Sequence, residues 1–167
     1  MSSYETYTVV DEVLKDRLRD PRLFKLNAIV ILSLKQKGRG VKYTPLPQSM
    51  FNQLVKFALD NKISIGFDSC SAGVFLLSVK QHPRYKEFLK VSEKCESSLY
   101  SVFIDVDGKY YPCSFCPGTD NWGEGLDVLA ANSFMDIWNH PTTVKFRNDL
   151  LINNRDCPIY TIGNLRK

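Results

Sequence analysis

Residues 95–116, CESSLYSVFIDVDGKYYPCSFC, decide the fold of the C-terminal part of the chain. Apolar and polar side chains alternate over residues 99–106, which is the pattern of a half-buried strand. Asp107-Gly108 is a strong signal for a two-residue turn, and residues 109–112 then return as a second strand. We therefore predict a β-hairpin whose two ends lie side by side.

The predicted hairpin should bring several cysteine side chains close together. It brings Cys95, which precedes the first strand, close to Cys113 and Cys116, which follow the second. Cys157 comes after the last expected helix and precedes Pro158, where the chain can return to the hairpin. Four thiolates fit tetrahedral zinc or an iron–sulfur cluster, and their spacing does not separate the two. Inert buried cysteines are the plainer alternative, because free Cys is often a small core side chain.

The composition is that of an ordinary globular protein of one-domain size, with 167 residues, 44% hydrophobic and 24% charged. Its net charge of +4 is spread among acidic residues, so nucleic-acid binding is not indicated. The longest apolar run, residues 28–34, is too short to span a bilayer, and the N-terminus does not have the pattern of a signal peptide. We expect a cytoplasmic protein, in which five cysteines favour metal binding over disulfides.

The N-terminal half predicts a strand–helix–strand unit. After an amphipathic helix at residues 6–18, the apolar run 28–34 is typical of a strand buried on both faces. Residues 45–61 predict a helix, and residues 63–67 a second, parallel strand. Two parallel strands do not make a stable sheet alone. We therefore expect a slice of a larger α/β barrel or sheet, or edges that pair with another polypeptide.

Further helices are expected at residues 71–94, with a break near His82-Pro83, at residues 133–138, with Ser133 as N-cap, and from Thr142 or Thr143 to about residue 154. Residues 117–132 are expected to form a loop.

Three further residues are candidates for ligand binding. Lys35 and Lys37 follow the first strand in a glycine-rich loop that could bind a carboxylate or phosphate, although a solvated basic loop is the commoner form of such a stretch. Cys70 follows the second strand, at the end where barrel folds place their active sites. It could be a cluster ligand, a catalytic thiol or a buried strand-end residue.

At the hairpin the sequence resembles a known family. Cys95, twelve further residues, Gly108, four more and Cys113 look like the opening of the SPASM and twitch extensions of radical S-adenosylmethionine enzymes. The stretch from Asp136-Ile137-Trp138 to Cys157-Pro158 is similar to the part that precedes the closing cysteine of such extensions. The resemblance implies that the hairpin and its flanking cysteines hold an auxiliary 4Fe-4S cluster.

On this resemblance the chain is expected to be an α/β protein, with a partial (β/α) barrel piece at residues 1–94 and a SPASM/twitch-like domain at residues 95–167. The metal ligands would be Cys95, Cys113, Cys116 and Cys157, and the cofactor-binding candidates are Lys35, Lys37 and Cys70.

The CxxxCxxC motif that cleaves S-adenosylmethionine in this family is absent from the 167 residues. The implied function is therefore the auxiliary cluster of a radical reaction. A partner chain or a missing N-terminal half would bind S-adenosylmethionine. The alternative is a zinc-stabilised binding module without redox chemistry.

Overall fold

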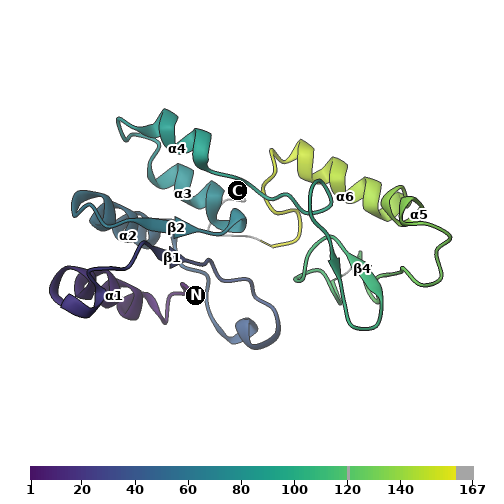
Figure 1. Cartoon of the computed structure of the whole chain (residues 1–167), viewed down its shortest axis with the longest axis horizontal. Coiled ribbons are helices and arrows are strands. Elements are labelled where there is room, and N and C mark those ends of the chain that lie inside the picture. Colours follow the sequence, from purple (N-terminus) through teal and green to yellow (C-terminus); the bar gives the residue numbers. More distant parts are fainter. Residues whose placement is uncertain (120, 161–167) are drawn as a thin grey trace. The chain divides into compact units, whose positions relative to one another are not determined.

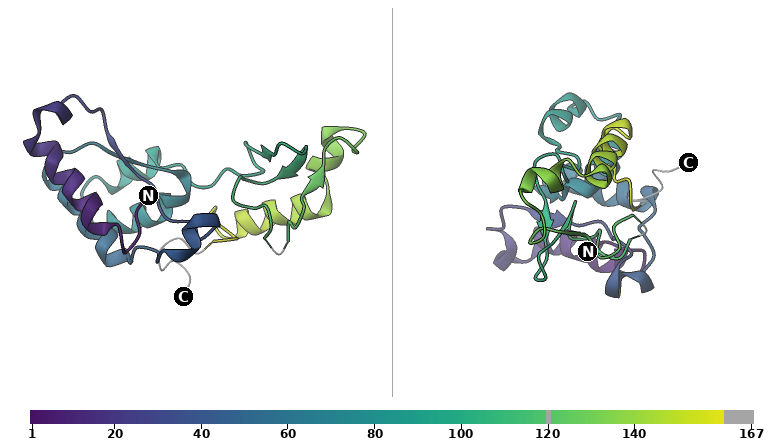
Figure 2. Two further views of the ribbon diagram at one scale, coloured as in Figure 1. Left: turned by 90° about the horizontal axis from the view of Figure 1, so that it is seen from below. Right: turned by 90° about the vertical axis from the view of Figure 1, so that its right-hand side faces the viewer.

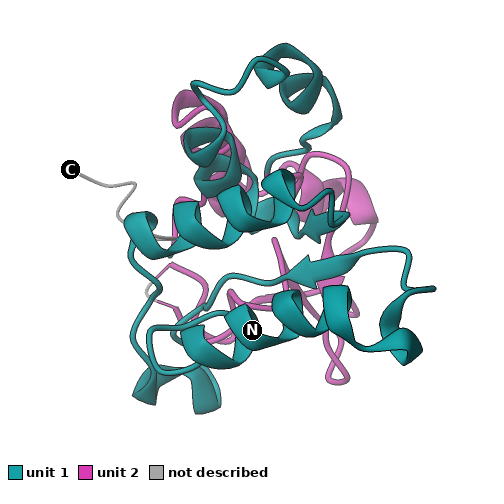
Figure 3. Ribbon diagram, turned by 90° about the vertical axis from the view of Figure 1, so that its left-hand side faces the viewer, with its two compact units in different colours: residues 1–94, 160–167 teal, residues 95–159 magenta. Residues whose placement is uncertain are grey.

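The chain divides into two compact units, which are coloured separately in Figure 3. The computed structural model describes residues 1–119 and 121–160. Within that range, the first unit comprises residues 1–94 and Tyr160, and the second comprises residues 95–159. None of the helices in the described part of the chain has the length and apolar character needed to cross a membrane.

The first unit is built on a parallel strand pair. Strand β1 (Ile29–Ile31) pairs with β2 (Ile65–Phe67), and helix α2 (Gln48–Asp60) lies between them in the chain. The strand–helix–strand order and the parallel pairing expected from the sequence are thus confirmed (Figure 1). The remaining elements are α1 (Tyr7–Arg19), α3 (Ala72–Ser78), α4 (Tyr85–Val91) and the 3-10 helices η1 (Pro21–Leu23), η2 (Gly38–Lys42) and η3 (Ser69–Ser71).

Helix α2 supplies much of the core of this unit. Its buried side chains are Phe51, Leu54, Val55 and Ala58, a spacing of three, one and three residues that places them on one face. That face packs against α1 and α3. The chain breaks between α3 and α4, as predicted, and Pro83 lies in the connection.

The sheet and the first helix are less buried than their sequences predict. Val30 is 59% exposed and Leu32 43% exposed, so the prediction of a seven-residue strand buried on both faces is wrong. On α1 only Leu14 is buried, while Val9 is 64% exposed, so the expected apolar stripe does not face the core along its whole length. Among the described residues, the sheet holds β1 and β2 alone. A two-stranded sheet does not establish the partial barrel.

The second unit contains the predicted hairpin. Strands β3 (Phe103–Ile104) and β4 (Lys109–Tyr111) are antiparallel. The backbone N–H of Asp105 donates to the carbonyl of Lys109 at 3.0 Å, and Gly108 has φ +73°. The connection is therefore a three-residue loop that ends in a left-handed glycine, and the expected two-residue turn is wrong.

A third strand, β5 (Leu126–Asp127), pairs with the other edge of β4 within the stretch expected to be a loop. Gly125 precedes it with φ +75°. A Cβ atom at Gly125 would lie 2.6 Å from Cζ of Tyr111 and 2.9 Å from the carbonyl oxygen of Tyr110. Only glycine allows the chain to pass this close to β4.

Helices α5 (Phe134–Trp138) and α6 (Pro141–Ile152) follow, joined by a short connection (Figures 1 and 2). Ser133 caps α5 as predicted, in a capping box with Asp136. His140 caps α6 by accepting a hydrogen bond from the backbone N–H of Thr142. The buried core of this unit consists of Cys95, Tyr110, Tyr111, Cys116, Trp122, Ile137, Phe146 and Leu150.

Candidate metal centre

The hairpin leads directly into a pair of neighbouring thiols. Cys113 follows β4 after one proline, and a turn closed by the backbone N–H of Cys116 and the carbonyl of Cys113 at 3.0 Å brings Cys116 back. The two sulfur atoms lie 3.4 Å apart. Tetrahedral thiolate ligands of one zinc ion lie about 3.8 Å apart, so the pair has nearly the separation that two ligands of a shared metal need. Cys116 is fully buried, and Cys113 is half-buried.

The pair also has the protonation chemistry of a ligand site. The hydrogen bond from Cys116 lowers the pKa of Cys113 to about 6, although burial opposes this shift. The same hydrogen bond and burial raise the pKa of Cys116. One thiolate is therefore present at neutral pH, held by the proton of the other sulfur. Thiolate is the form of cysteine that binds metals.

Ser97 links Cys95 to this pair. The Cys95 thiol donates to Oγ of Ser97 at 3.3 Å, and a hydrogen bond from the Ser97 side chain helps to lower the pKa of Cys113. Both Cys95 and Ser97 are buried. The hydroxyl of Ser97 is thus within reach of the thiols at both ends of the hairpin.

Arg155 ties the end of the chain to its first cysteine. Nε of Arg155 donates to the carbonyl oxygen of Cys95 at 2.8 Å, across 60 residues of sequence. Cys157 lies two residues further on and is half-buried. Its charge adds a smaller contribution, after those of Cys113 and burial, to the raised pKa of Cys116. These two interactions connect the end of the second unit with the parts that carry Cys95 and Cys116.

The fourfold ligand set itself stays a prediction. Within residues 1–119 and 121–160, no three Cys, His, Asp or Glu side chains lie close enough to hold one metal ion. The candidate donors are nevertheless all soft sulfur atoms, and those of Cys95, Cys113 and Cys116 lie in or against an apolar core. Their chemistry fits zinc or an iron–sulfur cluster, and it does not fit magnesium or calcium, which prefer oxygen ligands.

The candidates in the first unit form a different arrangement. Lys35 is buried and forms an ion pair with Asp68, at the carboxyl ends of β1 and β2. Asp68 also accepts hydrogen bonds from the backbone and side chain of Ser71, whose Oγ donates to Oγ of Ser33 at 2.8 Å. Lys35 is therefore not part of a solvated basic loop, because its charge is already balanced by a carboxylate.

Lys37 is half-buried at the start of η2, and Cys70 is half-buried within η3. Both belong to the first unit, whereas the four hairpin-associated cysteines belong to the second. No described contact tests a cofactor role for Lys35, Lys37 or Cys70.

Comparison with known protein families assigns the second unit. Residues 95–159 match the SPASM family model, an iron-sulfur cluster-binding domain. No curated protein and no solved structure matches the chain. The SPASM match covers less than half of the chain. It begins at Cys95, ends two residues beyond Cys157, and leaves out Cys70 and both candidate lysines. It supports an iron–sulfur cofactor in the second unit.

Two residues of this SPASM region escaped sequence reasoning. Ser97 and Arg155 each lie two positions from a candidate ligand, and each makes a hydrogen bond that connects two parts of the site. Serine and arginine are common surface residues, so neither residue type indicated a role in the metal site. Proximity in sequence to Cys95 and Cys157 was the available clue.

Proposed function

We propose that this chain binds a 4Fe-4S cluster through Cys95, Cys113, Cys116 and Cys157, and that it supplies this auxiliary cluster to a radical S-adenosylmethionine reaction. The observation that carries the proposal is the extent of the family match. The SPASM match spans residues 95–159, and four of the five cysteines, at 95, 113, 116 and 157, lie inside it. Cys70, the remaining cysteine, lies outside it.

The protein's own residues prepare the ligands. The Cys113–Cys116 pair offers one thiolate at neutral pH, and further thiols release protons as a metal binds. Ser97 can donate a hydrogen bond to sulfur, which is one of the means by which proteins tune such centres. Tyr110 and Trp122, both buried in the same core, limit the access of water.

A bound 4Fe-4S cluster supplies electron transfer or, where one iron lacks a protein ligand, a point of attachment for substrate. Four cysteine ligands favour the electron-transfer role. Loss of Cys157 from the ligand set would leave three and favour the anchoring role.

Cleavage of S-adenosylmethionine is assigned to another polypeptide or to a preceding segment. The sequence contains no two cysteines separated by three residues, so the CxxxCxxC arrangement is missing from these 167 residues. The first unit supports a partner of this kind, because its two-stranded sheet has an outer edge on each strand and the unit exposes Val30 and Leu32. A partner chain that carries the motif would complete the reaction.

The competing proposal is a zinc-stabilised binding module. It is favoured by one observation: the 3.4 Å separation of the Cys113 and Cys116 sulfurs is close to the separation of two thiolate ligands on a single zinc ion. The family match weighs against it.

The decisive test is purification of the full chain without oxygen, followed by measurement of iron, acid-labile sulfide, zinc and visible absorption. We expect a brown protein with iron and sulfide in equal amounts. Cys113→Ser should lose most of the iron, and Cys70→Ser, the matched control, should keep it. A colourless protein with one zinc per chain would replace the proposal with the zinc module.

A further inference from the structure

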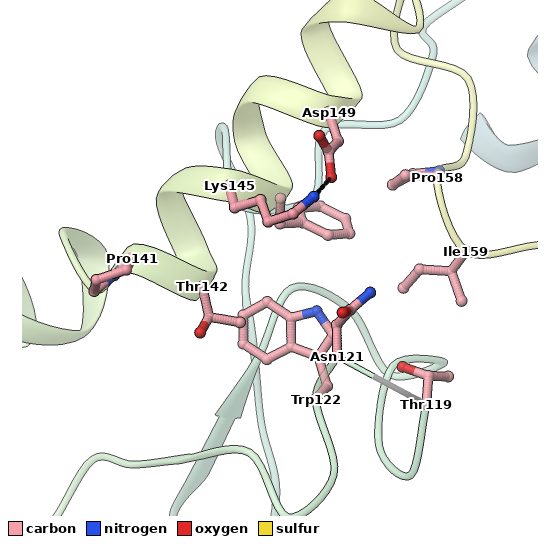
Figure 4. Close-up of a pocket in the computed structure, with 10 residues that line it drawn as sticks. Thr119, Asn121, Trp122, Pro141, Thr142, Lys145, Asp149, Pro158 and Ile159 are labelled. Carbon is pink, nitrogen blue, oxygen red and sulfur yellow. Dashed lines mark hydrogen bonds and ion pairs between the residues drawn. The ribbon is translucent and has the colours of Figure 1, made fainter.

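A cavity of about 430 Å³ lies in the second unit, beside the segments that carry Cys116 and Cys157 (Figure 4). Thr119, on one wall, donates its hydroxyl to the carbonyl of Cys116 at 2.7 Å. Pro158 and Ile159, on another wall, directly follow Cys157. Every lining residue belongs to residues 95–159, so the cavity is a feature of one compact unit. Its volume is in the range of small-molecule sites.

Two aromatic rings contribute to the apolar lining of the cavity, together with Pro141, Pro158 and Ile159. Trp122 and Phe146 are both buried, and they meet edge to face with their ring centroids 6.2 Å apart and their planes at 78°. Ile159 lines the same cavity, on the side of Trp122 away from Thr142 in Figure 4. Such walls favour a flat apolar ligand, because aromatic surfaces gain contact area and ring–ring attraction together.

The charges of the described residues that line the cavity sum to zero. Lys145 and Asp149, one turn apart on α6, form an ion pair at 2.6 Å. The other polar side chains, Thr119, Asn121 and Thr142, are neutral. A charged ligand would have to lose its hydration without gaining an opposite charge, and this is costly. With respect to the described lining residues, an uncharged molecule avoids this cost.

The indole N–H of Trp122 sets the remaining requirement. It has no hydrogen-bond partner within the described residues, and it lies on the edge of the ring turned toward Asn121 in Figure 4. A ligand that covers this edge without bringing an acceptor would leave the N–H unpaired. The ligand must therefore offer a carbonyl or an equivalent oxygen.

We propose that this cavity binds a small, uncharged, planar aromatic molecule that accepts a hydrogen bond from the Trp122 indole and stacks against the Trp122–Phe146 corner. The inference concerns the cavity alone. It holds whether the neighbouring thiols carry iron or zinc, so failure of the cluster proposal and failure of this one are separate results.

The test is isothermal titration calorimetry of the full chain, purified without oxygen, with three probes that share one ring system. Indole-3-acetamide is uncharged, indole-3-acetate is an anion and tryptamine is a cation. We expect indole-3-acetamide to bind with a dissociation constant of about 1 mM, the affinity usual for a fragment of this size, and more tightly than either charged probe. Tighter binding of either charged probe would overturn the inference.

Substitutions place the probe in the cavity. Trp122→Phe keeps the apolar surface and removes the N–H, and should weaken indole-3-acetamide binding by about three- to tenfold, the value of one neutral hydrogen bond. Trp138→Phe makes the same chemical change on α5, outside the cavity, and should leave the affinity unchanged.

Asn121→Phe tests the location without touching the core, since Asn121 is an exposed residue that lines the cavity. The larger side chain should block binding, whereas Asn148→Phe, exposed on α6 and not part of the lining, should not. Undiminished binding in Asn121→Phe, or equal loss in both variants of either pair, would show that the probe binds elsewhere and would overturn the inference.

Discussion

Replacing Gly125 with alanine should destabilise the second unit far more than the same change at Gly118. Both glycines have nearly the same backbone angle, φ +75° and +72°, so both variants pay the cost of a left-handed alanine, about 1 to 2 kcal/mol. At Gly118 the added Cβ meets nothing within 4 Å. At Gly125 it would lie 2.6 Å from the Tyr111 ring and 2.9 Å from a backbone carbonyl, and backbone atoms cannot move aside cheaply.

Overpacking of this kind adds about 1 to 3 kcal/mol, which gives a total of about 2 to 5 kcal/mol for Gly125→Ala. Urea unfolding followed by tryptophan emission measures the difference, because both tryptophans of the chain, Trp122 and Trp138, lie in the second unit. Gly125→Ala should also retain less iron, since Tyr111 lies two residues before Cys113. Free energies of unfolding for the two variants that agree within about 0.5 kcal/mol would refute the close packing of β4 against residue 125.

Three further predictions concern other parts of the chain. Lys35→Met should lower the free energy of unfolding by about 3 kcal/mol, measured by thermal unfolding, because it removes the cation that pairs with Asp68. Lys56→Met, which breaks an exposed ion pair with Asp60, should lower it by less than about 0.5 kcal/mol. Hydrogen bonding by Thr44 lowers the pKa of Glu5 from 4.5 to about 2. The stability that ionised Glu5 contributes is therefore complete above pH 4.5 and is lost as the pH falls toward 2. Acid unfolding of Glu5→Gln, followed by circular dichroism, should lack the loss of stability between these two pH values. Ser133→Ala should destabilise the second unit by about 1 kcal/mol through loss of the α5 capping box, read from tryptophan emission, and an equal effect of Ser114→Ala, an exposed loop position, would contradict this assignment.

Local signals in the sequence predicted the elements that depend on neighbouring residues. The hairpin around Gly108, the cap at Ser133 and the break before α4 follow from turn and capping chemistry within a few positions. The loop length at Gly108 was wrong by one residue, because the same Asp-Gly pair serves both the two-residue turn and the three-residue loop with a left-handed glycine.

Features that depend on distant contacts were not predictable in the same way. Strand β5 has only two residues and exists because Gly125 allows the chain to approach β4. Val30 has the sequence character of a buried strand residue but is 59% exposed, since burial depends on what covers a strand and not on the strand itself. The ion pair of Lys35 with Asp68 joins two strand ends 33 residues apart, so no local sequence pattern predicts it.

The candidate site also combines features that local sequence predicts with one that depends on a distant contact. The Cys113–Cys116 pair is a local motif, and its proximity follows from the turn between the two residues. Cys95 joins it through the hairpin. Arg155 binds the carbonyl of Cys95 from the far end of the unit. This contact could be found only in the folded structure.

X-ray absorption spectroscopy of the anaerobically purified full chain, at the iron and zinc edges, tests the central claim most directly. We predict iron surrounded by sulfur, with a second shell of neighbouring iron atoms, and the loss of this signal in Cys113→Ser but not in Cys70→Ser. A zinc edge with four sulfur neighbours at about 2.3 Å, and no iron, would contradict the account.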